Sequence, residues 1–298
     1  MAWGLDIEAD RLRLCAAAAA GGRVRLQRWG EAAVPAGLLQ PSLTAPNLPD
    51  AAALGRILLG LAREVRCRGW VRVALPDDVF SLRTLLTDDL PPEPAEARRF
   101  LRWQARDLLP FPAEETRLDF VAGLPPADGR QRIVCLMARE RVLADYERLL
   151  AEAGLHAARL DARSVALAQA ASRRLGSRTA GLVSLAAGRL TILVVEAGLP
   201  RFRRTLAGAP DDAARDRLLR EVADSLAFCR ESEGTAPVEE LLLDAPAGLG
   251  DGLAAELSAW LEIPVSPLQP AALGLAAGAK LADPPRWGAA IGAAVAPC

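Results

Sequence analysis

Two stretches of the chain share one order of apolar and polar positions, and both predict the same run of elements. In each stretch, three short apolar runs separated by tight turns predict three strands, and apolar residues at helical spacing then precede one further buried strand. The first stretch predicts strands over 1–7, 11–18, 23–29 and 70–75, with a helix over 50–65. The second predicts strands over 180–185, 190–196, 201–206 and 240–244, with a helix over 212–231.

The two stretches align at a constant offset of 178 residues, which places Asp6 opposite Ser184 and Leu12 opposite Leu190. A duplicated α/β half of this order is what an actin-like fold (a duplicated ribonuclease-H-like fold) requires. We therefore expect an α/β protein with a first half over 1–178 and a second half over 179–298. We expect the last segment of the second half to pack back on the first.

A separate α+β unit interrupts the first half at about 78–138. Strands are predicted over 79–86, 117–122 and 131–138, and an amphipathic helix over 93–109. Pro110-Phe111-Pro112 ends that helix, because proline cannot continue a helical hydrogen-bond ladder. The chain then returns to the first half through a helix over 139–153, a strand over 155–160 and a helix over 162–175.

Scarce residue types exclude several kinds of chemistry. Charges nearly balance, with a formal net charge of −1, which argues against a nucleic-acid or anionic-membrane surface. His156 is the single histidine, and the five cysteines are widely spaced without a C-x-x-C pair. Neither a metal centre nor disulfides are expected, and buried free thiols in a reducing cytoplasm are the simpler interpretation. The N-terminus lacks the pattern of a secretory signal, so we expect a cytoplasmic protein.

Four segments in the expected order carry a resemblance to one known family. They are GLDI at 4–7, RVALPDDVFSLRTL at 72–85, RWQARDLLPFPAEETRLDFV at 102–121 and ADYERLLAEAGLHAARLDARSVALAQA at 144–170. Together they resemble the PilM family, the actin-like cytoplasmic proteins of type IV pilus machines, to which GspL of type II secretion and MshI look similar. The resemblance implies a partner, the short cytoplasmic N-terminus of a PilN-like inner-membrane protein, captured by strand addition or in a groove.

An actin-like fold also raises the question of ATP and magnesium. Such a site needs glycine-rich hairpin tips whose backbone N–H groups face the phosphates, and acidic residues that hold the metal. The first hairpin keeps Asp6, but Glu8 stands where the family has glycine, and Asp10 adds a second carboxylate. Unit charges about 4 Å apart repel by roughly 4 kcal/mol at an intermediate dielectric, which Arg11 could offset in part.

The second hairpin and the late turn depart from the pattern as well. Ser184 stands where an aspartate is usual, and Gly188 is the one glycine of its hairpin. Ala245 and Pro246 replace the Gly-Gly turn that would lie against adenine, which adds bulk and removes a backbone donor. The connector over 205–210 leads almost directly into a helix, so the helical subdomain usual over the nucleotide is expected to be reduced.

The sequence thus favours a degenerate nucleotide cleft and a non-catalytic scaffold, with no catalytic residue, no metal and no cofactor. Two alternatives stay open: an actin-like protein that still binds or hydrolyses ATP, and the cytoplasmic domain of a GspL-like secretion protein. Phe100, Trp103 and Phe111 are candidates for a partner-binding patch, although packing within the inserted unit is the simpler interpretation of these residues.

Overall fold

Two five-stranded sheets with the same strand order form the framework of the molecule. The computed structural model describes residues 2–20, 23–123, 129–208, 212–246, 248–269, 273, 275 and 284–296. The strands of the first sheet run β3-β2-β1-β4-β8, and those of the second run β11-β10-β9-β12-β13. Each sheet begins with an antiparallel meander and continues with two parallel strands, so the duplication predicted from the sequence is confirmed in the strand order.

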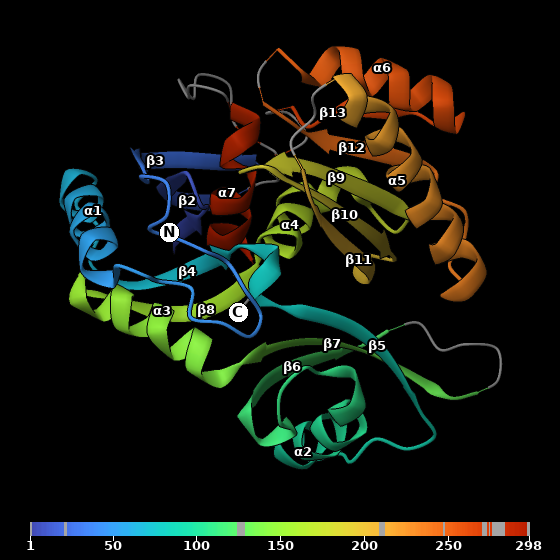
Figure 1. Ribbon diagram of the computed structural model, residues 1–298, viewed down its shortest axis with the longest axis horizontal. Helices are drawn as coiled ribbons and strands as arrows, with labels where there is room; N and C mark the ends of the chain where they lie inside the picture. Colours follow the sequence, from blue (N-terminus) through green and yellow to red (C-terminus); the bar gives the residue numbers. More distant parts are fainter. Residues whose placement is uncertain are drawn as a thin grey trace.

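The first sheet lies between two layers of helices (Figure 1). Its strands are β1 (Ala2–Ile7), β2 (Arg11–Ala20), β3 (Arg23–Ala33), β4 (Gly69–Leu75) and β8 (Leu155–Ala162). One face packs against α1 (Ala51–Glu64) and α3 (Glu140–Glu152) through a core that includes Leu5, Val73 and Leu54. Asp50 caps α1 by accepting a hydrogen bond from the backbone N–H of Ala53.

The second sheet consists of β9 (Ala180–Ala186), β10 (Arg189–Glu196), β11 (Leu199–Ala207), β12 (Glu240–Asp244) and β13 (Val265–Pro267). Its outer face packs against α5 (Asp212–Ser232) and α6 (Gly250–Leu261). Only residues 208–211 separate β11 from α5. The short connector expected in place of a helical subdomain falls partly on residues 209–211, which lie outside the described residues.

Two helices fill the space between the sheets. They are α4 (Arg163–Leu175) and α7 (Gly288–Val295), and they share a core with Cys15 of the first sheet and Leu182 and Leu193 of the second. Although α7 comes from the end of the chain, it packs on β1, β2, β4 and α4. Figure 1 shows it in red between the two sheets.

The inserted unit is a three-stranded sheet with one helix on it. Its strands are β5 (Ser81–Thr87), β6 (Thr116–Ala122) and β7 (Gln131–Arg139) in the order β5-β7-β6, and α2 (Pro94–Gln104) covers one face. The helix is shorter than predicted, because Ala105 closes α2 and 106–108 form a separate 3₁₀ turn before the prolines.

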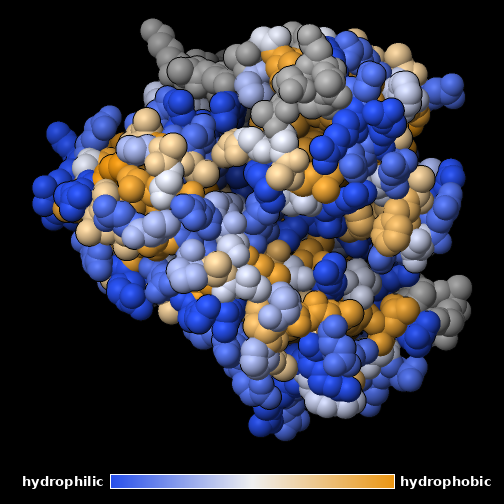
Figure 2. Space-filling model, viewed as in Figure 1, coloured by the Kyte–Doolittle hydropathy of each residue, from blue (hydrophilic) through white to orange (hydrophobic). Residues whose placement is uncertain are grey.

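The surface in Figure 2 is mostly hydrophilic, with small apolar groups between charged residues. None of the described helices is long and apolar enough to cross a membrane.

Candidate functional site: an ion-pair cluster between the two halves

The ends of the central strands of both sheets carry acidic and hydroxyl side chains that face one another. Asp6 lies near the end of β1, next to Ala74 in the parallel strand β4. In the second sheet, Ser184 of β9 lies beside Asp244 of the parallel strand β12. Ligands of open α/β sheets bind at the carboxyl ends of parallel strands, so this is the position that the duplicated fold provides for a site.

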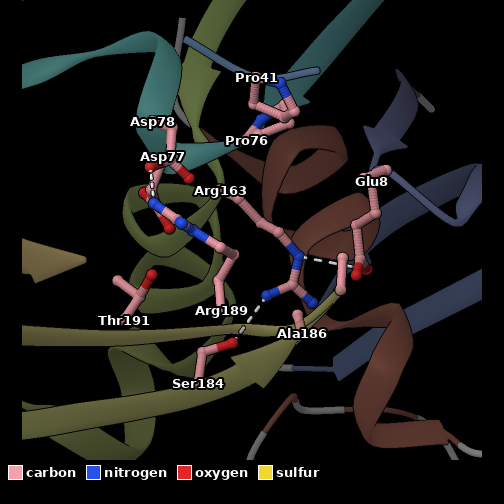
Figure 3. A pocket seen from close by; sticks show the side chains of 12 residues that line it. Glu8, Pro41, Pro76, Asp77, Asp78, Arg163, Ser184, Ala186, Arg189 and Thr191 are labelled. Atoms are coloured by element: carbon pink, nitrogen blue, oxygen red, sulfur yellow. Dashed lines mark hydrogen bonds and ion pairs between the residues drawn. The ribbon is translucent and has the colours of Figure 1, made fainter. Parts of the chain in front are cut away.

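The side chain of Arg163 occupies the space between these strand ends (Figure 3). Arg163 is the first residue of α4 and directly follows β8, and its side chain is only 5% exposed. Its Nε lies 3.3 Å from Glu8 Oε1 and 3.5 Å from Asp6 Oδ2, both in the first half. Its guanidinium donates to Ser184 Oγ at 2.8 Å and to Asp244 Oδ2 at 3.1 Å, both in the second half.

A second buried arginine completes the cluster from within the first half. Arg13 on β2 donates to Glu8 Oε1 at 2.7 Å and lies 3.8 Å from Asp6 Oδ2. Its side chain is 2% exposed. The half-exposed Glu31 on β3 lies 3.5 Å from Arg13 Nε, and Arg286 lies 3.7 Å from Glu8 Oε2. The carboxylates of Asp6 and Glu8 are therefore surrounded by arginines that belong to the chain itself.

Burial and these arginines set the protonation of the two carboxyls in opposite directions. Burial raises the pKa of Asp6 to about 8, because Arg163 and Arg13 compensate only part of the lost hydration. Burial alone would also raise the pKa of Glu8, but Arg163, Arg13 and Arg286 outweigh it and hold that pKa below its usual range. Burial opposes the charge of Arg163, yet Glu8, Asp6 and Asp244 raise the pKa of its guanidinium well above the ordinary value. Asp6 therefore keeps its proton to a higher pH than Glu8 does.

The tip of the first hairpin differs in two respects from what the sequence suggested. Glu8 and Arg11 close the turn through mutual backbone hydrogen bonds, yet the Glu8 side chain points inward and is only 2% exposed. Of the two expected tip carboxylates, only Asp10 is exposed. Arg11 does not offset Glu8: it pairs with Glu31 at 3.3 Å, and Arg13 pairs with Glu8 instead. Arg11 and Arg13 point to the same face of β2, where both lie near Glu31, and Arg13 is the one that reaches Glu8.

The second hairpin is closed by a two-residue turn. Ala187 and Gly188 both have positive φ, +47° and +73°, as the hairpin turn between twisted strands requires. Ser184 donates to Asp244 Oδ2 at 2.7 Å while it accepts from Arg163, so both of its hydrogen-bonding roles are used within the cluster. The late turn follows Asp244 with Ala245, which is 8% exposed, and the half-buried Pro246. Side-chain carbon therefore lies where an actin-like nucleotide site would have a bare Gly-Gly backbone.

The space left beside the cluster is small. A cavity of about 120 Å³ is lined by residues of both halves, including Glu8, Arg163, Ser184 and Arg189. Cavities that bind drug-sized ligands measure about 300–1,000 Å³, so this one has no room for a nucleotide in the present arrangement. Among the residues that the structure describes, no three His, Cys, Asp or Glu side chains are grouped so that they could hold a metal ion.

The loop after β4 links the halves at the rim of this cavity. Asp77 accepts hydrogen bonds from the N–H of Ser164 at 3.1 Å and from its hydroxyl at 2.6 Å, and lies 3.4 Å from Arg203 of β11. The neighbouring Asp78 forms an ion pair with Arg189 at the start of β10. These pairs cross between the halves beside the pairs of Arg163.

The three candidate partner-binding aromatics do not lie on one exposed patch. Phe111 is only 7% exposed, and the Arg139 guanidinium lies 5.7 Å from the centre of its ring. Phe100 is half-buried and packs on the core of the inserted unit. Trp103 is 60% exposed, and the Arg106 guanidinium lies 4.6 Å from the centre of its ring. Trp103 is thus the one member of the three that offers most of its surface to a partner.

Sequence reasoning missed three members of the cluster: Arg13, Arg163 and Asp244. The sequence did contain a signal for Asp244, because this residue ends the strand predicted after the long helix of the second half. In the first half, Ala74 and Leu75 end the corresponding strand β4. Arg163 gave no such signal, because nothing in the RLDARSVA segment shows that the side chain after β8 reaches the other half.

Comparison with solved structures shows the fold. A chain of a "PilM-PilN type IV pilus biogenesis complex" superposes with a TM-score of 0.82 over 98% of this chain and 96% of that chain, at 23% identity. The cytoplasmic domain of EpsL, an inner-membrane component of the type II secretion system of Vibrio cholerae, gives a TM-score of 0.50 at 10% identity over 82% of each chain. A Bacteroides thetaiotaomicron protein with an actin-like ATPase fold and unknown function gives 0.50 at 12% identity over 91% of each chain.

No protein-family model matches the sequence, and no curated protein matches it. The likeness to solved structures nevertheless confirms the predicted actin-like fold. It also confirms, at the level of the fold, the resemblance to PilM that the sequence motifs indicated.

Proposed function

We propose that this protein is a non-catalytic scaffold of a type IV pilus machine, located in the cytoplasm and attached to the inner membrane through a PilN-like partner. The observation that carries the proposal is the likeness to the PilM–PilN structure over 98% of this chain, inserted unit included. The weaker likeness to the EpsL cytoplasmic domain keeps a related secretion machine as the second candidate.

The non-catalytic part of the proposal rests on the cluster. Glu8, Ser184 and Asp244 all contact Arg163, and the adjoining cavity measures only about 120 Å³. A polyphosphate entering this cleft would have to displace Arg163 and meet the ionised Glu8. Binding of ATP and magnesium would therefore require breaking buried ion pairs before any new contact forms, and we propose that neither serves as a cofactor.

The partner segment, in this proposal, docks on the exposed side of the inserted unit. Trp103 on α2 and Leu108 in the following 3₁₀ turn are 60% and 47% exposed. Exposed tryptophan is a frequent anchor in protein interfaces because it buries a large apolar area with little loss of side-chain freedom. The chemistry suits an apolar side chain of a short peptide, with Arg106 beside it for a carboxylate or carbonyl.

Binding to the peptide partner tests the proposal directly. Fluorescently labelled N-terminal peptides of inner-membrane proteins encoded beside this gene are titrated with the protein and followed by anisotropy. We expect one PilN-like peptide to bind, and Trp103→Ala to weaken it by about tenfold or more. Trp70→Ala is the matched control, since Trp70 is 69% exposed on the first sheet, away from the inserted unit. If no neighbouring membrane protein supplies a binding peptide, the scaffold assignment fails.

A calorimetric titration with Mg²⁺ and ATP separates the scaffold from the ATPase alternative. We expect no binding at nucleotide concentrations up to about 1 mM, where an ordinary ATP site would be saturated. A dissociation constant in the micromolar range would instead show that the cluster opens for nucleotide, and would return the actin-like ATPase to first place.

A further inference from the structure

Arg163 joins the two halves of the molecule through a single buried guanidinium. On one side its Nε lies within 3.5 Å of Asp6 and Glu8; on the other, its terminal nitrogen contacts Ser184 and Asp244 at 2.8 and 3.1 Å. Arg13, the other buried cation of the cluster, contacts only carboxylates of the first half. Of these two arginines, Arg163 is therefore the one that contacts carboxylates of both halves.

The contribution of each half explains why a cation is needed. The first half brings Asp6 and Glu8 to the interface, and the second half brings Asp244, each less than 3% exposed. Without a positive charge between them, Glu8 and Asp244 would face each other across a poorly hydrated gap, and the halves would repel. A divalent metal is the usual solution between carboxylates, but here the chain supplies the charge from the first turn of α4.

Further arginine–aspartate pairs cross the same boundary. Arg189 and Arg203, both on strands of the second sheet, pair with Asp78 and Asp77 in the loop after β4. Arg203 also donates to the backbone carbonyl of Phe80, and Ser164, next to Arg163, holds Asp77 in place through two hydrogen bonds. The pairs around Arg163 thus belong to a continuous polar seam from the cluster to the rim of the cavity.

We propose that Arg163 is a built-in cation that latches the two halves of the fold together, in the place where a bound metal ion would otherwise bridge their carboxylates. The latch fixes the relative position of the halves without any ligand, so the surfaces on either side keep one arrangement. The proposal does not depend on the identity of the partner, because it concerns only contacts within the chain.

Distance measurement between the halves tests the latch. Spin labels are placed at Arg56→Cys on α1 and Trp260→Cys on α6, both exposed, with Cys298 replaced by serine. Double electron–electron resonance then gives the distribution of distances between the halves. We expect one narrow distribution in the parent chain and a broad or longer one after Arg163→Met, which keeps the apolar stem but removes the charge.

Hydrogen exchange gives an independent measure at the interface itself. In the Arg163→Met variant, amides of the second hairpin (residues 184–191) should exchange at least about tenfold faster, since the contacts that cover them are released. Arg215→Met is the matched control: it removes an arginine that pairs with Glu256 inside the second half, and should leave both readouts unchanged.

A folded Arg163→Met protein with a narrow distance distribution and unchanged exchange overturns the latch. If that variant does not fold, Asp244→Asn replaces it, because this change keeps the shape of the side chain and removes only the charge that Arg163 contacts in the second half. Broadening in Asp244→Asn supports the latch, and an unchanged distribution overturns it.

Discussion

Helix α7 lies so close to α4 that one added methyl group at Gly292 should force the two helices apart. A Cβ atom on Gly292 would lie 1.7 Å from the backbone oxygen of Ala166 and 3.1 Å from the backbone nitrogen of Ala170. An ordinary carbon–oxygen contact is about 3.4 Å, so the helices would have to separate by roughly 1.7 Å. The obstacle is backbone, which cannot rotate away as a side chain would. The change Gly292→Ala therefore tests how tightly the centre of the molecule is packed.

The size of the effect follows from what such a separation would uncover. On the opposite side of α7, a Cβ on Gly4 of β1 would lie 2.0 Å from the oxygen of Ala290, so the helix has no room to move toward the sheet. Overpacking of a well-packed core costs about 1–3 kcal/mol, occasionally more. Since both sides of α7 are in backbone contact, we expect Gly292→Ala to lower the free energy of unfolding by about 3 kcal/mol.

Gly60→Ala provides the matched control, with the opposite sign expected. Gly60 lies on the exposed side of α1, and nothing lies within 4 Å of a Cβ added there. Alanine in a helix interior is more stable than glycine by about 0.5–1 kcal/mol. At about 2–4 °C per kcal/mol, the two variants should differ in melting temperature by about 8–16 °C in circular dichroism. A Gly292→Ala protein that melts at or above the parent temperature would refute the reasoning.

Further predictions concern the charge cluster and two local structures. Because its pKa is raised, Asp6 keeps a proton in the native state that it loses in the unfolded state, so the free energy of unfolding should fall from about pH 4 to pH 8. In urea unfolding, Asp6→Asn should flatten this pH dependence, and an unchanged slope would contradict the prediction. The lowered pKa of Glu8 acts in the reverse sense: its stabilisation is present at neutral pH and is lost as the pH falls below the pKa that Glu8 has in the unfolded state. Glu8→Gln should therefore cost about 3 kcal/mol or more at pH 7, and less in acid. The fully buried Asn47 forms hydrogen bonds with Ser42, Ala45 and Tyr146. In the same assay, Asn47→Ala should therefore cost about 2–3 kcal/mol and Tyr146→Phe only about 1 kcal/mol, and equal losses would count against this network. Glu93→Ala, which removes the cap of α2, should cost about 1 kcal/mol, and no loss would mean that the cap is replaced by water.

The order of the elements could be predicted from the sequence because it depends on local patterns. Short apolar runs between tight turns predicted β1 and β9, and helical spacing predicted α1. The constant offset of 178 residues predicted that both sheets would share one strand order. The end of α2 was misplaced, because the helical periodicity continues past Gln104 while the backbone turns into a 3₁₀ segment before Pro110. Such boundaries depend on the hydrogen bonds of a few residues, which a hydrophobic pattern does not resolve.

The candidate site was predicted only in part, for the same physical reason. Asp6, Glu8 and Ser184 were identified because they lie in hairpins whose role in the fold is local and repeated. The sequence also indicated that the hairpins had changed away from a phosphate site. It could not indicate where the Glu8 carboxylate points. Arg11 was predicted to offset the charge of Glu8, whereas Arg13 forms that ion pair.

The sequence by itself determined a duplicated α/β chain with an interrupted first half and altered hairpins. Only the tertiary structure decided what occupies the space between the halves. Arg163 and Asp244 are 81 residues apart in the chain and meet because two separate sheets bring their strand ends together around α4. The charge of a buried group depends on every neighbour within a few ångströms, and those neighbours come from β1, β2, α4 and β12 at once. For that reason, the sequence shows only two hairpins that resemble a changed nucleotide site. In the folded protein, the same hairpins form a closed seam between the two halves.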